Sequence, residues 1–168
     1  YPFKGERIPK LEDFFLLCAK TGMKPMLSVH PNLDGHWTAI KNMANNCGVL
    51  HMLGIKSDKV TIEYPMAVLG DEVESYTIDT HATTTSGMNE VISAFNGYKT
   101  TYGITNARCV IEGMEPEVWI DDNIALVKSA GYELALVSPN NIEQVKTFIG
   151  KGIHEFTEDY NSSSGLNW

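Results

Sequence analysis

Short apolar runs typical of β-strands alternate with amphipathic runs typical of helices along the whole chain. In each helical run, apolar residues recur at i, i+3 and i+4. Glycine follows several helical runs directly before a strand, as in Ala130-Gly131-Tyr132, which suits the crossovers of a parallel sheet. The predicted strands are Lys24–His30, Val60–Tyr64, Ser75–His81, Ala107–Glu112, Tyr132–Ser138 and Ile153–Glu158. The order of elements predicts an α/β fold.

The helical runs have recognisable ends. Gly22 is expected to terminate the first helix, and Asp34, Ser86 and Asp121 or Asp122 are candidate N-caps of later ones. The predicted helices are Ile8–Gly22, Gly35–Leu53, Ser86–Tyr98, Asn123–Ala130 and Ile142–Ile149, with Pro65–Leu69 as a single turn. Two architectures fit this order: a doubly wound open sheet, or most of a (β/α)8 barrel. Neither GxGxxG nor GxxxxGK[ST] follows a strand, which removes the common nucleotide-binding reasons for the open sheet.

Polar residues lie where the predicted strands end. The carboxyl ends of parallel strands open onto one face, and ligands bind at that face. The pattern therefore predicts one polar site built from many strand ends. Carboxylates that face one cavity would repel, raise one another's pKa and favour cation capture. The candidate residues are His30, Glu63, Asp79, His81, Glu112, Ser138 and Glu158.

Length and charge narrow the possible functions. A chain of 168 residues is one domain by the usual length prior, which we place at residues 1–160, with a tail over 161–168. The net charge of −8 and the lack of a Lys/Arg cluster argue against a nucleic-acid partner. The apolar runs are far short of the roughly 20 residues that span a bilayer. The absence of Gly-x-Ser-x-Gly and His-Glu-x-x-His argues against serine hydrolase and zincin chemistry.

Three segments point to a family. Arg7–Phe14 running into Met26–His30, then Ala130–Asn140, then Gly152–Tyr160 resemble, in order and spacing, segments of glycerophosphodiester phosphodiesterases. The resemblance implies a TIM (β/α)8-type barrel of which only strands three to eight are present, with the first two βα units upstream of Tyr1. It also implies metal-assisted hydrolysis of glycerophosphodiesters, with a divalent cation (Ca²⁺ or Mg²⁺) and two histidines as acid and base.

The family's catalytic set is only partly matched. Both family histidines and two of the metal-binding carboxylates fall upstream of Tyr1. Ser28 stands at the position of the third carboxylate, and His30 replaces a lysine. A hydroxyl binds a hard cation less well than a carboxylate does. The roles we expect are His30 as catalytic acid or base; Ser28, Glu63, His81, Ser138 and Glu158 as substrate-binding residues; and Glu63, Asp79 and Glu112 as metal ligands.

These departures leave alternatives open. In one, His30 substitutes in catalysis; in the other, Ser28 marks an inactive site and His30 is merely hydrogen-bonded at its rim. The corresponding functions are phosphodiester hydrolysis by the intact parent, or an inactive barrel that binds glycerol-phosphate or sugar-phosphate polymer as a surface or virion module. An unrelated sugar-processing barrel is a third hypothesis. A sheet that lacks two strands has open edges, so we expect a homo-oligomer or a complementing N-terminal segment, besides a small-molecule or polymer substrate.

Overall fold

Six helices and six strands alternate along the described part of the chain. The computed structural model describes residues 10–29, 31–33, 35–137, 139, 142–153 and 155–157. The strands are β1 (Met26–Ser28), β2 (Gly54–Asp58), β3 (Ser75–Thr80), β4 (Arg108–Gly113), β5 (Glu133–Val137) and β6 (Glu155–Thr157). The helices are α1 (Leu11–Thr21), α2 (Trp37–Asn46), α3 (Glu63–Leu69), α4 (Thr85–Tyr102), α5 (Asp121–Ser129) and α6 (Ile142–Gly150). Short 3-10 turns are η1 (Pro31–Leu33), η2 (Leu50–Met52), η3 (Gly70–Glu72) and η4 (Pro116–Val118).

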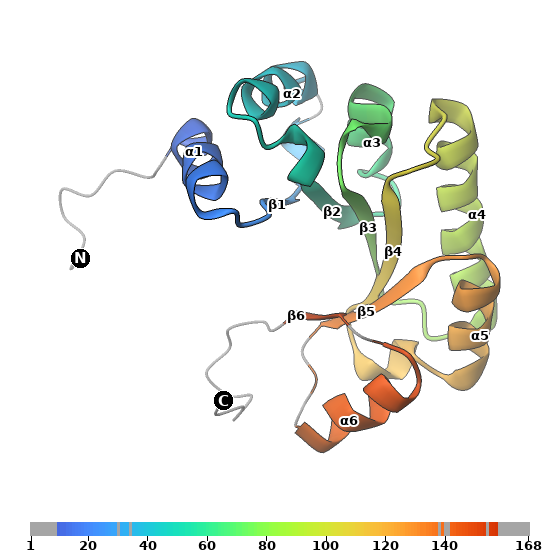
Figure 1. The fold of residues 1–168 in the computed structure, drawn as a ribbon. Coiled ribbons are helices and arrows are strands. Elements are labelled where there is room, and N and C mark those ends of the chain that lie inside the picture. Colours follow the sequence, from blue (N-terminus) through green and yellow to red (C-terminus); the bar gives the residue numbers. More distant parts are fainter. Residues whose placement is uncertain are drawn as a thin grey trace.

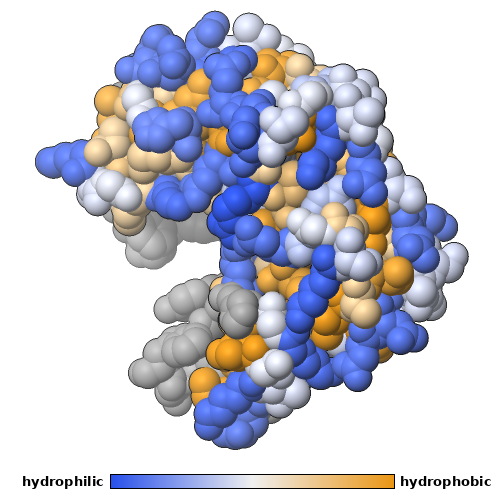
Figure 2. All heavy atoms as spheres, turned by 45° about the vertical axis from the view of Figure 1, so that its right-hand side comes forward, coloured by the Kyte–Doolittle hydropathy of each residue, from blue (hydrophilic) through white to orange (hydrophobic). Residues whose placement is uncertain are grey.

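All six strands are parallel and lie in one sheet in chain order, β1-β2-β3-β4-β5-β6. The sheet curls, and the helices lie along its convex side, so the strands form a half-barrel (Figure 1). The space-filling view shows the molecule hollowed on the opposite side (Figure 2). This α/β half-barrel is consistent with part of a TIM-type barrel. None of the helices in the described part of the chain is long and apolar enough to cross a membrane.

The hydrophobic core lies between the convex side of the sheet and the helices. Ile55 of β2, Ile78 of β3 and Ile111 of β4 are fully buried in it. Since successive strand residues point to opposite faces, the residues between them face the concave side. On the helical side, α4 contributes the stripe Met88, Val91, Ile92 and Phe95, which has the spacing of one helix face.

The strand predicted over Val60–Tyr64 is wrong. The chain instead forms β2 over Gly54–Asp58, turns, and begins α3 at Glu63. The turn is fixed by Asp58, whose carboxylate accepts hydrogen bonds from the backbone N–H groups of Val60 (2.8 Å) and Thr61 (3.0 Å). This Asx-type turn outweighs the β-propensity of the Val60-Thr61-Ile62 run.

The helix predicted over Gly35–Leu53 is shorter than expected. Regular α2 ends at Asn46, and Gly48 then adopts a φ of 73° before the turn η2. A left-handed glycine of this kind terminates a helix. Gly22 ends α1 in the same way, with a φ of 71°, as predicted.

Two N-caps also differ from the predictions. Thr84, not Ser86, caps α4, because its side-chain oxygen accepts a hydrogen bond from the Gly87 N–H at 3.2 Å. Asp121 and Asp122 lie in the first turn of α5 rather than at its cap, where their charges still favour the helix dipole. The predicted cap Asp34 lies outside the described residues.

Candidate functional site

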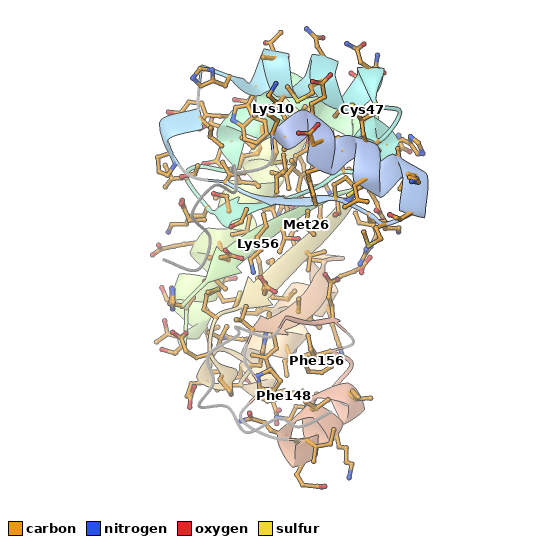
Figure 3. All side chains as sticks on the ribbon, turned by 90° about the vertical axis from the view of Figure 1, so that its left-hand side faces the viewer. Lys10, Met26, Cys47, Lys56, Phe148 and Phe156 are labelled. Atoms are coloured by element: carbon orange, nitrogen blue, oxygen red, sulfur yellow. The ribbon has the colours of Figure 1, made fainter. Side chains whose placement is uncertain are left out.

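Three charged side chains from neighbouring strands meet on the concave face of the sheet. They are Lys56 of β2, Asp79 of β3 and Glu112 of β4, which we call the Lys56 cluster. Asp79 and Glu112 are register partners, and Lys56 lies across from Thr77, two residues before Asp79. The Lys56 ammonium bonds the Glu112 carboxylate and lies 3.6 Å from Oδ1 of Asp79. Figure 3 looks into the open side of the half-barrel, with Lys56 between Met26 of β1 and Phe156 of β6.

Sheet geometry explains why these residues converge. The lysine and both carboxylates alternate with apolar residues of the core, so all three point away from the helices. Asp79 and Glu112 lie near the carboxyl ends of their strands, and the long lysine stem carries its ammonium up to their level. This is the end of a parallel barrel at which active sites are built.

The cluster is largely withdrawn from solvent. The Glu112 side chain is 2% exposed, and those of Lys56 and Asp79 are 16% and 21% exposed. Burial, opposed by the nearby Lys56 ammonium and reinforced by Glu112, raises the pKa of Asp79 to about 7. A carboxyl group with this pKa exchanges its proton near neutral pH, which is the property required of a general acid or base.

A further polar group lies beside the cluster on the same face. Thr77 is 3% exposed, and its hydroxyl has no hydrogen-bond partner in the described part of the chain. Ser28 of β1 is the register partner of Lys56 on its other side, and its side chain is exposed. The concave face therefore carries a hydroxyl-bearing residue on each side of Lys56 in the sheet.

The rim above β3 carries a second polar pair. His81 follows β3, and its Nδ1 lies 2.6 Å from Oε1 of Glu115; the imidazole is 71% exposed. His81 lines a hollow of about 280 Å³ at the carboxyl ends of β2 and β3, together with Asp58, Lys59 and Asp79. The structure thus places His81 and Asp79 along one hollow, as the strand-end pattern indicated.

Glu63 does not join these residues. It begins α3, on the helical layer, and its carboxylate accepts a hydrogen bond from the Tyr102 hydroxyl at 2.9 Å. Its expected place at a strand end followed from the incorrect strand over Val60–Tyr64. His30, Ser138 and Glu158, which were also predicted to belong to the site, lie outside the described residues.

The described carboxylates do not by themselves form a site for the divalent cation that the family resemblance implies. Hard cations take several oxygen ligands, and carboxylates bind them better than hydroxyls do. Glu63 is on another layer, Ser28 offers only a hydroxyl, and the Lys56 ammonium already lies against Asp79 and Glu112. Across the described ranges, no group of three or more His, Cys, Asp or Glu side chains is placed to hold a metal ion.

The opposite end of the sheet carries a different ion-pair group. Arg108, at the start of β4, donates to Glu133 (3.0 Å) and Glu155 (3.3 Å) at the starts of β5 and β6. The hydrogen bond from Arg108 lowers the pKa of Glu133 despite partial burial. Residues at the amino ends of barrel strands contribute to stability, so this group is structural.

Lys56 is the residue of this cluster that the sequence pattern did not indicate. The run Gly54-Ile55-Lys56-Ser57-Asp58 holds few apolar residues, and it lies between the predicted helix Gly35–Leu53 and the predicted strand Val60–Tyr64, in neither of them. The available signal was the glycine at its start. A Cβ at Gly54 would lie 2.8 Å from the Met26 sulfur, so a glycine there allows the Met26 side chain to lie over β2.

The fold is similar to a crystal structure from Silicibacter pomeroyi DSS-3, of a protein assigned as a glycerophosphoryl diester phosphodiesterase. The TM-score is 0.61 and the sequence identity 16%. The match covers 94% of this chain and 55% of that one, so the chain spans about half the length of its structural neighbour. At this identity the likeness shows the fold alone. No protein-family model and no curated protein matches the sequence.

Proposed function

We propose that the chain forms the third to eighth strands of a TIM-type barrel with phosphodiesterase-like activity. The intact barrel would hydrolyse a glycerophosphodiester, or a polymer built from such units. The observation that carries this proposal is the Lys56 cluster, which lies at the carboxyl ends of parallel strands in a fold similar to that of a protein assigned as a glycerophosphoryl diester phosphodiesterase.

In this proposal Lys56 binds the phosphate. The Lys56 ammonium has three N–H donors. If Asp79 and Glu112 each accept one hydrogen bond from it, two of these donors are used. The remaining donor is available to a phosphate oxygen, and the positive charge offsets the charge of the diester. Ser28, across from Lys56 in the register, supplies a hydroxyl that hydrogen-bonds the same group.

Asp79 acts as the general acid. A water oxygen forms the new bond to phosphorus while the bond from phosphorus to the alcohol oxygen breaks. Asp79 donates its proton to the departing alcohol oxygen, and His30, outside the described residues, takes the proton of the attacking water. The raised pKa of Asp79 supports this role, because a proton donor works best with a pKa near the working pH.

The test is a hydrolysis assay of the full natural polypeptide with glycerophosphocholine and with bis(p-nitrophenyl) phosphate. Asp79→Asn and His30→Ala are each expected to lower kcat by about 10²–10⁴-fold, the usual range for a lost acid or base. The matched control is Asp121→Asn, which removes an exposed carboxylate paired with Lys151 at 2.7 Å and is expected to leave kcat unchanged.

Unchanged turnover in both variants would remove these residues from the mechanism and with them the proposal. Absence of turnover with saturable binding of glycerol 3-phosphate would favour the inactive barrel instead. Binding of glycerol 3-phosphate tests the phosphate site alone, because it involves no hydrolysis.

A further inference from the structure

The cation that lies on the Asp79–Glu112 pair belongs to the chain itself. These two residues are register partners on adjacent strands, and the Glu112 carboxylate is almost fully buried. Two carboxylates held together away from water repel each other, and a cation between them relieves that repulsion. Lys56 supplies the cation from the next strand.

We propose that the Lys56 ammonium takes the place of a divalent ion on this carboxylate pair. The native site then engages an anionic ligand without a divalent ion, and removal of the ammonium turns the site into a divalent-cation site formed by Asp79, Glu112 and Thr77. The inference about the anionic ligand rests on the proposed function, whereas the inference about the cation does not.

The oxygen donors around Lys56 support the inference that the site binds a divalent cation once the ammonium is removed. Without the lysine, the concave side carries two carboxylates and, two residues before Asp79 on the same face of β3, the Thr77 hydroxyl, and all are oxygen donors of the kind that Ca²⁺ and Mn²⁺ accept. The Thr77 hydroxyl is buried and has no hydrogen-bond partner in the described residues, so it is available as a ligand. Water would complete the coordination shell.

Tethering explains why Lys56 holds the site against free ions. Its stem belongs to β2 of the same sheet, so the ammonium competes as an intramolecular ligand with a high effective concentration. A divalent ion would have to displace the ammonium of a side chain that is only 16% exposed, and the displaced positive charge would remain close to the positive charge of the ion.

Isothermal titration calorimetry of the full chain with CaCl2 and with MnCl2 tests the proposal. Wild type is expected to show no saturable binding tighter than about 1 mM, the weak end of protein calcium sites. Lys56→Ala is expected to bind one ion at least about tenfold more tightly, because a like charge has been removed. The double variant K56A/E112Q is expected to lose that ion. Lys59→Ala, which removes a surface lysine paired with Glu90, is the matched control and is expected to gain none.

Because Lys56→Ala leaves charge in a buried site, Lys56→Gln is measured beside it, and thermal unfolding of both is followed with and without CaCl2. A rise in Tm with CaCl2 in these variants, and not in wild type or K59A, supports the proposal. It is overturned if wild type binds a divalent ion that E112Q abolishes, or if neither Lys56 variant gains an ion or a Tm rise. Neither readout involves hydrolysis, so the inference about the cation and the proposed function fail independently.

Discussion

Lys56 and Glu112 form an ion pair across an intervening strand: Lys56 is on β2, Glu112 is on β4, and β3 lies between them. Lys56→Met would leave the nearly buried Glu112 carboxylate without its ammonium. Breaking a buried pair from one side costs about 3–5 kcal/mol, so we expect a loss of this size in the free energy of unfolding at pH 7. Urea unfolding followed by circular dichroism measures it.

Two further variants test whether the loss of stability in Lys56→Met comes from the unpaired Glu112 carboxylate. The double variant K56M/E112Q removes both charges and is expected to recover most of the loss. Lys59→Met breaks the solvent-exposed pair with Glu90 (3.2 Å) and is expected to cost about 0–1 kcal/mol. Equal losses in the two single lysine variants would mean that the Lys56 cluster has no special place in the fold.

Asp71 gives the chain a pH-dependent element far from the Lys56 cluster. Its carboxylate accepts hydrogen bonds from the Thr105 hydroxyl (2.6 Å) and from the backbone N–H groups of Thr105 (2.9 Å), Asn106 (2.9 Å) and Ala107 (3.1 Å). Burial raises the pKa of Asp71, but these hydrogen bonds outweigh it and hold that pKa well below its usual value.

The sign of the pH effect follows from this shift. A carboxyl group whose pKa is lower in the folded state stabilises the fold above its unfolded pKa of about 3.9, and this contribution is lost as the pH falls below it. Asp71→Asn should therefore lower the free energy of unfolding by about 1–2 kcal/mol at pH 7, a discounted value for hydrogen bonds to a charged group. The difference from wild type should shrink steadily below about pH 4, as urea unfolding over a pH series would reveal. A difference that stays constant down to pH 2 would contradict the assignment.

Gly113 tests the packing at the end of β4. A Cβ at this position would lie 2.6 Å from Trp119 Nε1 and 3.0 Å from the Val118 Cβ. The indole cannot easily retreat, because its N–H donates to the Ala135 carbonyl oxygen at 2.9 Å. Gly113→Ala is expected to cost about 1–3 kcal/mol, as overpacking of a core does.

The control for this substitution is Gly97→Ala in α4. A Cβ at Gly97 meets nothing within 4 Å, and the position lies inside a helix. Alanine there is expected to stabilise the chain by up to about 1 kcal/mol, since it has the higher helix propensity. Thermal unfolding monitored by tryptophan fluorescence compares the two. A neutral Gly113→Ala would show that the Trp119 ring has more room than its contacts suggest.

The sheet was the most predictable part of the molecule. Ser75–His81 matches β3 (Ser75–Thr80) and Ala107–Glu112 matches β4 (Arg108–Gly113) to within one residue at each end, because the alternating run of β3 and the apolar run of β4 are both recognisable strand patterns. Val60–Tyr64 misled, since side-chain hydrogen bonds of Asp58 decide the local structure there and propensity does not record them.

The site was predictable only in part. Asp79 and Glu112 followed from the rule that strand ends converge, which needs no knowledge of pairing. The role of Lys56 depends on which strands are neighbours and on their register, and these are properties of the folded sheet. Glu63 was misplaced for the same reason as its strand. Pattern alone therefore indicated the end of the sheet that carries the Lys56 cluster, and tertiary structure was required to identify the cation of that cluster.

The open edges of the half-barrel predict self-association of the chain. Within the described part of the chain, β1 and β6 each pair with one neighbouring strand, so the outer backbone N–H and C=O groups of both edges have no strand partner there. The apolar residues Leu16 and Leu17 of α1 and Met26 of β1 are 52%, 50% and 44% exposed. Sedimentation velocity of residues 1–168 is expected to show species that grow with concentration.

Leu17→Glu places a charge on this surface and is expected to shift the distribution toward monomer, whereas Val60→Glu, at an exposed apolar position in the turn after β2, is expected to leave it unchanged. A monomer at every concentration that unfolds in one cooperative transition would mean that these edges are protected.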